Sequence, residues 1–179
     1  SAASDVYKRQ IIGCEVYVAR RTRFDKQHEF DAESRHLVLL CKNETGYRNL
    51  SYMVSQAYIE GFYIKPRIDM ELLRAHSDGL IALSACLAGE IPKRLMNGDY
   101  SGAKAYVLEM RGIFGEDFYL ELQDHGIAEQ TEVNRGLLRL HNETGIPLVC
   151  TNDAHYLRKE DAESHDVLPV SYTHLTLPT

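Results

Sequence analysis

The chain is predicted to be an α/β protein, because short apolar segments alternate with amphipathic helical segments along most of its length. The apolar segments are rich in branched residues, which is typical of buried strands. Several helical segments follow an Asn or Asp that can cap a helix, or stop at a glycine. This order implies right-handed β-α-β units and a mainly parallel sheet, either open or closed into a barrel.

Five segments are predicted to be strands. The first alternates and is β-branched, and a polar, basic loop separates it from the second. In chain order the predicted strands are residues 11–18, 36–40, 80–83, 118–122 and 148–151.

Six segments are predicted to be helices. Asn43, Asp69 and Asp99 are expected to cap three of them, and Gly61 and Gly145 are expected to end two. The predicted helices are residues 44–60, 70–75, 89–96, 100–113, 129–144 and 159–167. Residues 61–69 contain a proline and are expected to be extended.

The bulk composition describes an ordinary globular protein and excludes several classes. Of 179 residues, 44% are hydrophobic and 26% are charged, and the net charge of -6 comes without a basic stripe, so the chain alone is a poor candidate for gripping a phosphate backbone. No apolar run is long enough to span a membrane, and no signal core is present. Four scattered cysteines without a C-x-x-C pair fit a reducing cytoplasm.

The two ends of the chain do not continue the pattern of the interior. Residues 1–10 (SAASDVYKRQ) and the segment from about Val170 (VSYTHLTLPT) resemble translated sequencing-adapter tails; the alternative is that they are genuine, irregular termini. We therefore expect one domain over residues 11–168, with non-native tails at 1–10 and 169–179, and expect the domain to be cut from a longer chain.

The most informative motif is Asp153-Ala154-His155, which follows the last predicted strand. Side chains two residues apart on an extended chain point to the same side, so one carboxylate and one imidazole would converge at the strand's end. Barrel enzymes of the α/β class build their sites there. The alternative is a solvated loop that contains both residues.

Three further metal-type residues lie at or near predicted strands: Glu15, His36 and Cys86. Each has a structural alternative: a solvent-facing carboxylate, a core histidine and a small buried thiol. His36 also starts its strand, which argues against a place at a shared mouth. Together with Asp153 and His155 they form a ligand set that suits zinc, manganese or iron, and carboxylates can bridge two or three ions for phosphate chemistry.

Other candidates carry less signal. His125 follows a predicted strand and is a candidate for lining the pocket or supporting the ligands. The basic run at residues 20–23 (RRTR) could touch phosphate or be a solvated loop. Walker, G-x-G-x-x-G, G-x-S-x-G and H-E-x-x-H motifs are absent, so nucleotide cofactors and serine hydrolysis are not supported.

Six sequence blocks resemble the PHP (polymerase and histidinol phosphatase) domain family, in its branch from bacterial DNA polymerase III alpha subunits. They are IIGCEVYVA, HLVLL with KNETGYRNL, EGFYIKPRID, GLIALSACLAGEIP, GEDFYLELQDHG and GIPLVCTNDAHYL. The resemblance implies a distorted (β/α)7 barrel with metals at the C-terminal mouth. Here the barrel is expected to be incomplete and to lack its first strands.

The resemblance also implies roles for the residues chosen above. The family's glutamate and following histidine fall on Glu15 and His36, its histidine-or-cysteine on Cys86, and its terminal D-x-H on Asp153 and His155. The family's upstream H-x-H and T-D-H motifs are absent from this sequence, so four ligands would be missing.

The implied function is that of a fragment of a replicative DNA polymerase's PHP domain, with potential metal-dependent 3′–5′ exonuclease or phosphoesterase activity. The parent would be a DNA-directed DNA polymerase, with magnesium for its polymerase domain and with DNA and other replicase subunits as partners. The fragment alone is expected to be inactive. The alternatives are a stand-alone phosphoesterase of the histidinol-phosphatase type and a non-catalytic scaffold that binds replication subunits.

Overall fold

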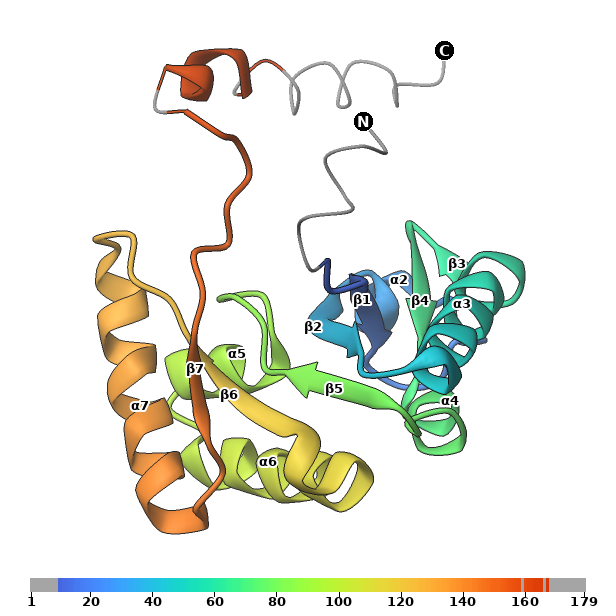
Figure 1. The fold of residues 1–179 in the computed structure, drawn as a ribbon, viewed down its shortest axis with the longest axis horizontal. Helices are drawn as coiled ribbons and strands as arrows, with labels where there is room; N and C mark the ends of the chain where they lie inside the picture. The colour runs from blue at the N-terminus through green and yellow to red at the C-terminus, as the bar shows by residue number, and fades with distance from the viewer. Residues whose placement is uncertain (1–9, 159, 166, 168–179) are drawn as a thin grey trace.

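A seven-stranded mixed sheet with helices packed against it forms the centre of the computed structural model, which describes residues 10–158, 160–165 and 167 (Figure 1). The strands follow the order β3-β4-β1-β2-β5-β6-β7. Within the described residues the edge strands β3 and β7 do not pair with each other, so the sheet is open. The prediction of an α/β protein with an incomplete barrel is confirmed.

The elements lie close to where the sequence predicts them. They are β1 (Gly13–Ala19), α2 (His28–Asp31), β2 (Ser34–Cys41), α3 (Glu44–Ile59), β3 (Phe62–Tyr63), β4 (Lys65–Ile68), α4 (Met70–Ala75), β5 (Leu80–Leu83), α5 (Glu90–Met96), α6 (Tyr100–Phe114), a 3-10 turn (Gly115–Asp117), β6 (Phe118–Leu122), α7 (Ala128–Thr144) and β7 (Leu148–Cys150). The sequence did not predict α2, and it placed β3 and β4 in one extended segment. The last predicted helix is only partly described, and residues 161–165 are helical.

The predicted helix caps are present because each capping side chain satisfies a backbone N–H that the first helical turn leaves free. Each accepts from the residue three positions on: Asn43 from Gly46 at 3.0 Å, Asp69 from Leu72 at 3.0 Å and Asp99 from Gly102 at 2.9 Å. Gly145 ends α7 with a left-handed φ of 71°, which a glycine adopts without steric cost.

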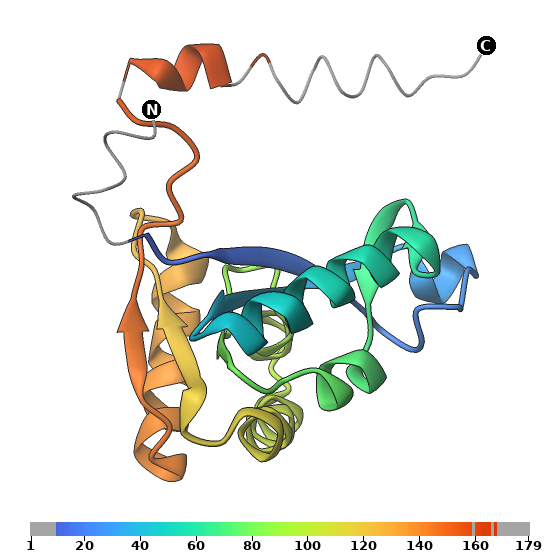
Figure 2. The ribbon, with the colours of Figure 1, turned by 45° about the vertical axis from the view of Figure 1, so that its right-hand side comes forward.

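The sheet is mixed, and this corrects the prediction of a mainly parallel sheet. β1, β4, β5, β6 and β7 run the same way, whereas β2 is antiparallel to both β1 and β5, and β3 is antiparallel to β4. The link from β1 to β2 contains only the four-residue α2, which is not a crossover helix of the kind that returns a chain to a parallel strand. The chain therefore turns back on itself, as Figure 2 shows.

One continuous hydrophobic core joins the sheet to its helices. Leu39, Met53, Leu73, Met110 and Phe118 are all at most 1% exposed and come from β2 and from elements on both sides of it. Figure 1 places α3 and α4 beside the β1-to-β4 end of the sheet and α5, α6 and α7 beside the other end. In the described part of the chain, no helix combines the length and apolar character needed to cross a membrane.

Both predicted tails lie almost wholly outside the described residues, which begin at residue 10 and end at residue 167. The division into residues 1–10, 11–168 and 169–179 therefore stays a prediction.

Candidate metal centre

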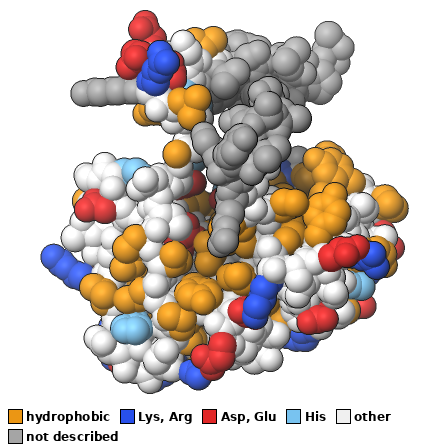
Figure 3. Space-filling model, viewed as in Figure 1, with side chains coloured by type: hydrophobic (Ala, Val, Ile, Leu, Met, Phe, Trp, Pro, Cys, Tyr) orange, Lys and Arg blue, Asp and Glu red, His pale blue; other side chains and the backbone are white. Residues whose placement is uncertain are grey.

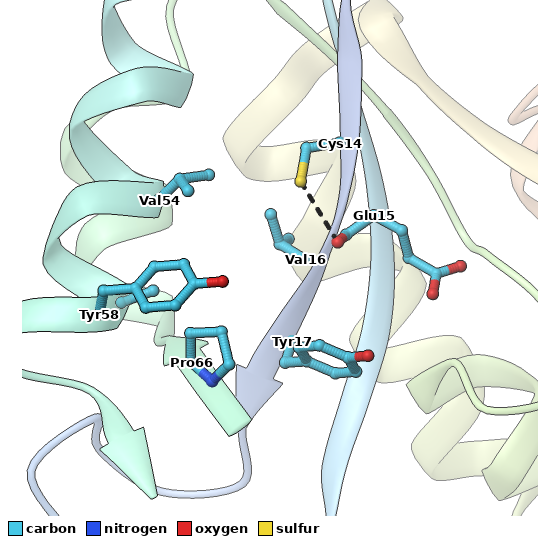
Figure 4. Close-up of a pocket in the computed structure, with 8 residues that line it drawn as sticks. Cys14, Glu15, Val16, Tyr17, Val54, Tyr58 and Pro66 are labelled. Atoms are coloured by element: carbon cyan, nitrogen blue, oxygen red, sulfur yellow. Dashed lines mark hydrogen bonds between the residues drawn. The ribbon is translucent and has the colours of Figure 1, made fainter. Parts of the chain in front are cut away.

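β1 presents two chemically different faces. Cys14 and Val16 point toward α3 and line an apolar pocket of about 130 Å³ with Tyr58 and Pro66 (Figure 4). The carboxylate of Glu15 points away from these apolar side chains, as strand alternation requires. The polar candidate site therefore lies on the face of β1 opposite this pocket.

His36 reaches Glu15 because β2 runs antiparallel to β1. The register pairs Tyr17 with His36 and Glu15 with Val38, so Glu15 and His36 are diagonal neighbours on one face. Their side chains meet, with His36 Nδ1 2.8 Å from Glu15 Oε1. His36 therefore reaches the cluster although it lies near the start of its strand, contrary to the expectation from the sequence, because the reversed β2 starts beside the end of β1.

Cys86 joins the same place from the other side of β2. β5 is also antiparallel to β2, so the chain that leaves β5 passes the beginning of β2, and the His36 N–H donates to Ala88 O at 3.1 Å. Cys86 Sγ lies 3.6 Å from His36 Nδ1. One ligand atom from each of Glu15, His36 and Cys86 lies within 4.8 Å of the others, and we call these three residues the ligand cluster.

The contacts within the ligand cluster shift its protonation. Hydrogen bonds to Cys86 and then to Glu15 raise the pKa of His36 to about 10, against an ordinary value of 6.5. The hydrogen bond from His36 lowers the pKa of Glu15, and the charges of His155 and Lys65 lower it further. At neutral pH an imidazolium therefore faces a carboxylate, and the two remain partly accessible, with side chains 22% and 37% exposed.

Asp153 and His155 lie in the segment that follows β7. Asp153 adopts a left-handed φ of 43°, and its carbonyl oxygen lies 2.8 Å from His155 Nδ1. Both residues line an open pocket with His125, Tyr156 and His165, among others. They are not members of the ligand cluster, although His155 is close enough to lower the pKa of Glu15. The structure thus brings three of the five candidates together and places the D-x-H pair nearby.

His125 links α7 to the segment after β7 beside this pocket. Its Nε2 lies 2.6 Å from the carbonyl oxygen of Asn152, and its Nδ1 lies 2.8 Å from Nε2 of Gln130. Gln130 Nε2 donates to Nδ1 of the ring, and Nε2 of the ring donates to the carbonyl oxygen of Asn152. His125 therefore restrains the residue directly before Asp153.

The basic run at residues 20–23 is largely exposed, as expected for a solvated loop, but Arg23 is buried. Arg21 forms an ion pair with the buried Asp31, and Arg23, itself 9% exposed, pairs with Asp69 and Glu60. Figure 3 likewise shows Lys and Arg side chains scattered, not gathered into a stripe, on the face it presents. Arg21 and Arg23 are therefore paired with carboxylates of the same chain.

Glu121 is a buried carboxylate that the sequence argument missed. It lies on β6, is 5% exposed, and contacts residues beside Cys86 and before Asp153. Glu121, Gln123 and His125 alternate along the chain, and this spacing puts polar groups on one side of an extended segment. This alternation of polar residues at the end of an apolar strand is the sequence pattern that could have identified Glu121.

Comparison with known proteins agrees with this architecture. The PHP domain model matches residues 2–125. DNA polymerase III subunit alpha of Treponema pallidum is 49% identical over 160 residues, and that of Thermus aquaticus is 48% identical over 169 residues. These alignments cover 88% and 93% of the chain, but the chain spans only 14% of the length of each relative. The chain therefore belongs to the PHP domain family and corresponds to the PHP region of DNA polymerase III alpha subunits.

Proposed function

We propose that the chain carries a divalent-metal site whose ligands include Glu15, His36 and Cys86, with Asp153 and His155 completing it. Within a replicative DNA polymerase, this site would support metal-dependent cleavage of a terminal phosphodiester, in the 3′–5′ direction. The observation that carries the proposal is the convergence of a carboxylate, an imidazole and a thiol from three separate segments within 4.8 Å.

The chemistry of the donors fits zinc or manganese, with iron as an alternative. Nitrogen, sulfur and oxygen donors are the set that zinc takes, at distances of about 2.0–2.3 Å. Neighbouring ligands of a tetrahedral zinc then lie roughly 3.4–3.6 Å apart, close to the 3.6 Å between Cys86 Sγ and His36 Nδ1. The 2.8 Å contact of His36 with Glu15 is a hydrogen bond, and it would lengthen when the bound proton leaves.

The residues of the ligand cluster have distinct tasks in this proposal. As ligands, the His36 imidazolium and the Cys86 thiol would each have to give up a proton, and Glu15 would supply negative charge that attracts a cation. A bound divalent cation would supply Lewis acidity to water and charge neutralisation to a phosphate. Asp153 and His155 would approach from the segment after β7, which His125 restrains.

The whole-protein function rests on the relatives. Because the matched proteins are named DNA polymerase III subunit alpha, we propose a parent that synthesises DNA, with magnesium in its polymerase domain and with DNA and other replicase subunits as partners. All four cysteines are free thiols, which supports a reducing cytoplasmic location. The same relatives favour the polymerase branch over a stand-alone phosphoesterase.

Zinc binding by the metal-free chain tests the proposal. We expect stoichiometric binding in competition with a chelator, and a loss of affinity of about 100-fold, or roughly 2.7 kcal/mol, in His36→Ala and in Cys86→Ala. His28→Ala, which removes an exposed histidine outside the cluster, is the matched control and should leave affinity unchanged. Equal affinity in all variants would disprove a site at the ligand cluster.

A second arm of that experiment separates the candidate functions. The sequence contains no H-x-H or T-D-H motif, so the isolated, zinc- or manganese-loaded chain should not degrade a 3′-labelled single DNA strand. Robust degradation that disappears in His36→Ala would show that the chain is catalytic without them. Absence of metal from the gently purified parent polymerase would instead favour a non-catalytic scaffold.

A further inference from the structure

Glu121 buries a carboxylate among neutral groups. Its Oε2 accepts the N–H of Ala85 at 3.0 Å, and its Oε1 accepts from Gln123 Nε2 at 3.1 Å and from the hydroxyl of Thr151. Burying a carboxylate is costly unless hydrogen bonds replace its hydration. An apolar side chain would fill the same space with a smaller desolvation penalty. We therefore look for the role of Glu121 in the groups that its carboxylate hydrogen-bonds.

The first of these groups is the turn that carries Cys86. Ala85 directly precedes Cys86 and has a φ of 63°, a left-handed conformation that is uncommon for residues other than glycine. Residues in such conformations persist where surrounding contacts determine them, and they concentrate at functional sites. The Ala85 N–H donates to the Glu121 carboxylate, and Ser84 Oγ accepts the backbone N–H of Glu121 at 2.8 Å. The turn after β5 is therefore fixed to β6 on both sides.

The second group is the end of β7. Thr151 is the first residue after β7 and lies two positions before Asp153. Its N–H donates to Leu122 O at 3.1 Å, and its hydroxyl donates to Glu121. The same carboxylate thus joins the segment that presents Cys86 to the segment that presents Asp153.

We propose that Glu121 is a positioning residue that sets the separation of the Cys86 turn and the Thr151–Asp153 segment. This role in metal binding rests on the proposed metal site, whereas the link between the two segments rests on the hydrogen bonds of Glu121. Groups that orient metal ligands without binding the ion contribute about 10–100-fold to metal affinity. Glu121 would act in this way through the backbone of both segments.

Glu121→Gln in the full 179-residue chain tests the inference. The substitution keeps the shape but replaces one acceptor oxygen with an NH₂ group that must face a donor. With zinc as the probe, we expect affinity to fall by about 10–100-fold. Asp69→Asn is the matched control, because Asp69 is also a buried carboxylate that accepts a backbone N–H, yet it lies in the ion pair with Arg23. It should lower stability and leave zinc affinity unchanged.

A second readout needs no metal. In the metal-free chain, the rate of Cys86 alkylation is followed by peptide mass mapping, with Cys14 as an internal reference. Loosening the Ala85 turn should raise the Cys86 rate several-fold in Glu121→Gln and leave the Cys14 rate unchanged. Thr151→Val, which removes one donor to the carboxylate, should move both readouts in the same direction and supplies the test if Glu121→Gln does not fold.

The outcomes separate this inference from the proposed function. If the wild-type chain binds zinc at the ligand cluster but a folded Glu121→Gln shows unchanged affinity and unchanged Cys86 alkylation, the positioning role is overturned and the metal site stands. If the wild-type chain binds no zinc while Glu121→Gln speeds alkylation of Cys86, the proposed function fails and the positioning role stands.

Discussion

Two clusters of ionisable side chains at the N-terminal half of the sheet have opposite characters. We call Arg21, Arg23, Arg67, Asp31 and Asp69 the arginine cluster. There, Arg21 and Arg23 face carboxylates, and Arg67, 1% exposed, donates to the carbonyl oxygens of Gly61, Asp31, Arg23 and Asp25. Cations are supplied by the chain itself, and all members except Arg21, whose side chain is 42% exposed, are buried.

The ligand cluster instead pairs one carboxylate with an imidazole whose positive charge is a bound proton, and a thiol lies beside them. Its members contact one another and stay partly accessible. The difference teaches that charge density alone does not mark a site. What matters is whether the positive charge is permanent, as on arginine, or is a proton that a metal ion can replace. The first cluster holds loops together, whereas the second has the composition to accept a cation from solution.

The largest effect is expected from opening the arginine cluster. Arg67→Met keeps an apolar stem but leaves the carbonyl groups of Asp31, Arg23 and Asp25 without the guanidinium donor, at a cost of about 1–3 kcal/mol for each buried group left unpaired. The carbonyl of Gly61 keeps the backbone N–H of residue 67. We expect a loss of at least about 3 kcal/mol in the free energy of unfolding, measured with urea.

The control for that measurement is Arg48→Met on α3, because Arg48 is 76% exposed and, among the residues that the structure describes, forms an ion pair only with Glu44 one turn away. Its change should stay within about 0.5 kcal/mol. A similar, small change in both variants would show that the arginine cluster does not carry structural stability.

An intermediate effect is expected from raising the pH of the metal-free chain. The folded-state pKa of His36 is about 10, above its ordinary value of 6.5. Its stabilisation is therefore fully present below pH 6.5 and is lost as the pH rises to about 10. The difference in unfolding free energy between wild type and His36→Gln should shrink across this window. A difference that stays constant would mean that His36 is not charged in the folded chain.

A smaller effect, in the acid range, is expected from the arginine cluster. The hydrogen bond from Arg21 lowers the pKa of Asp31 from 3.8 to about 2. Its stabilisation is present above pH 3.8 and is lost as the pH falls to about 2, the opposite sign to His36. Asp31→Asn should remove part of the acid dependence of the melting temperature, whereas Glu129→Gln on the exposed start of α7 should not. Identical acid profiles for the two variants would contradict the pairing.

Much of the local structure could be predicted because its causes lie within a few residues. Asn43, Asp69 and Asp99 cap their helices through the N–H three residues on, and the bounds of α4, β5 and β6 agree with the prediction. The donor types of the ligand cluster were also visible in the sequence, because carboxylate, imidazole and thiol chemistry belongs to the residue itself.

Only the tertiary structure decided which of these groups meet. The reversal of β2 brings His36 beside Glu15, and packing against β5 adds Cys86. The burial of Arg23 and of Glu121 depends on partners 46 and 36 residues away in the sequence. Local propensity is set by neighbours in the chain, whereas strand direction and burial are set by contacts between segments that meet only when the sheet forms.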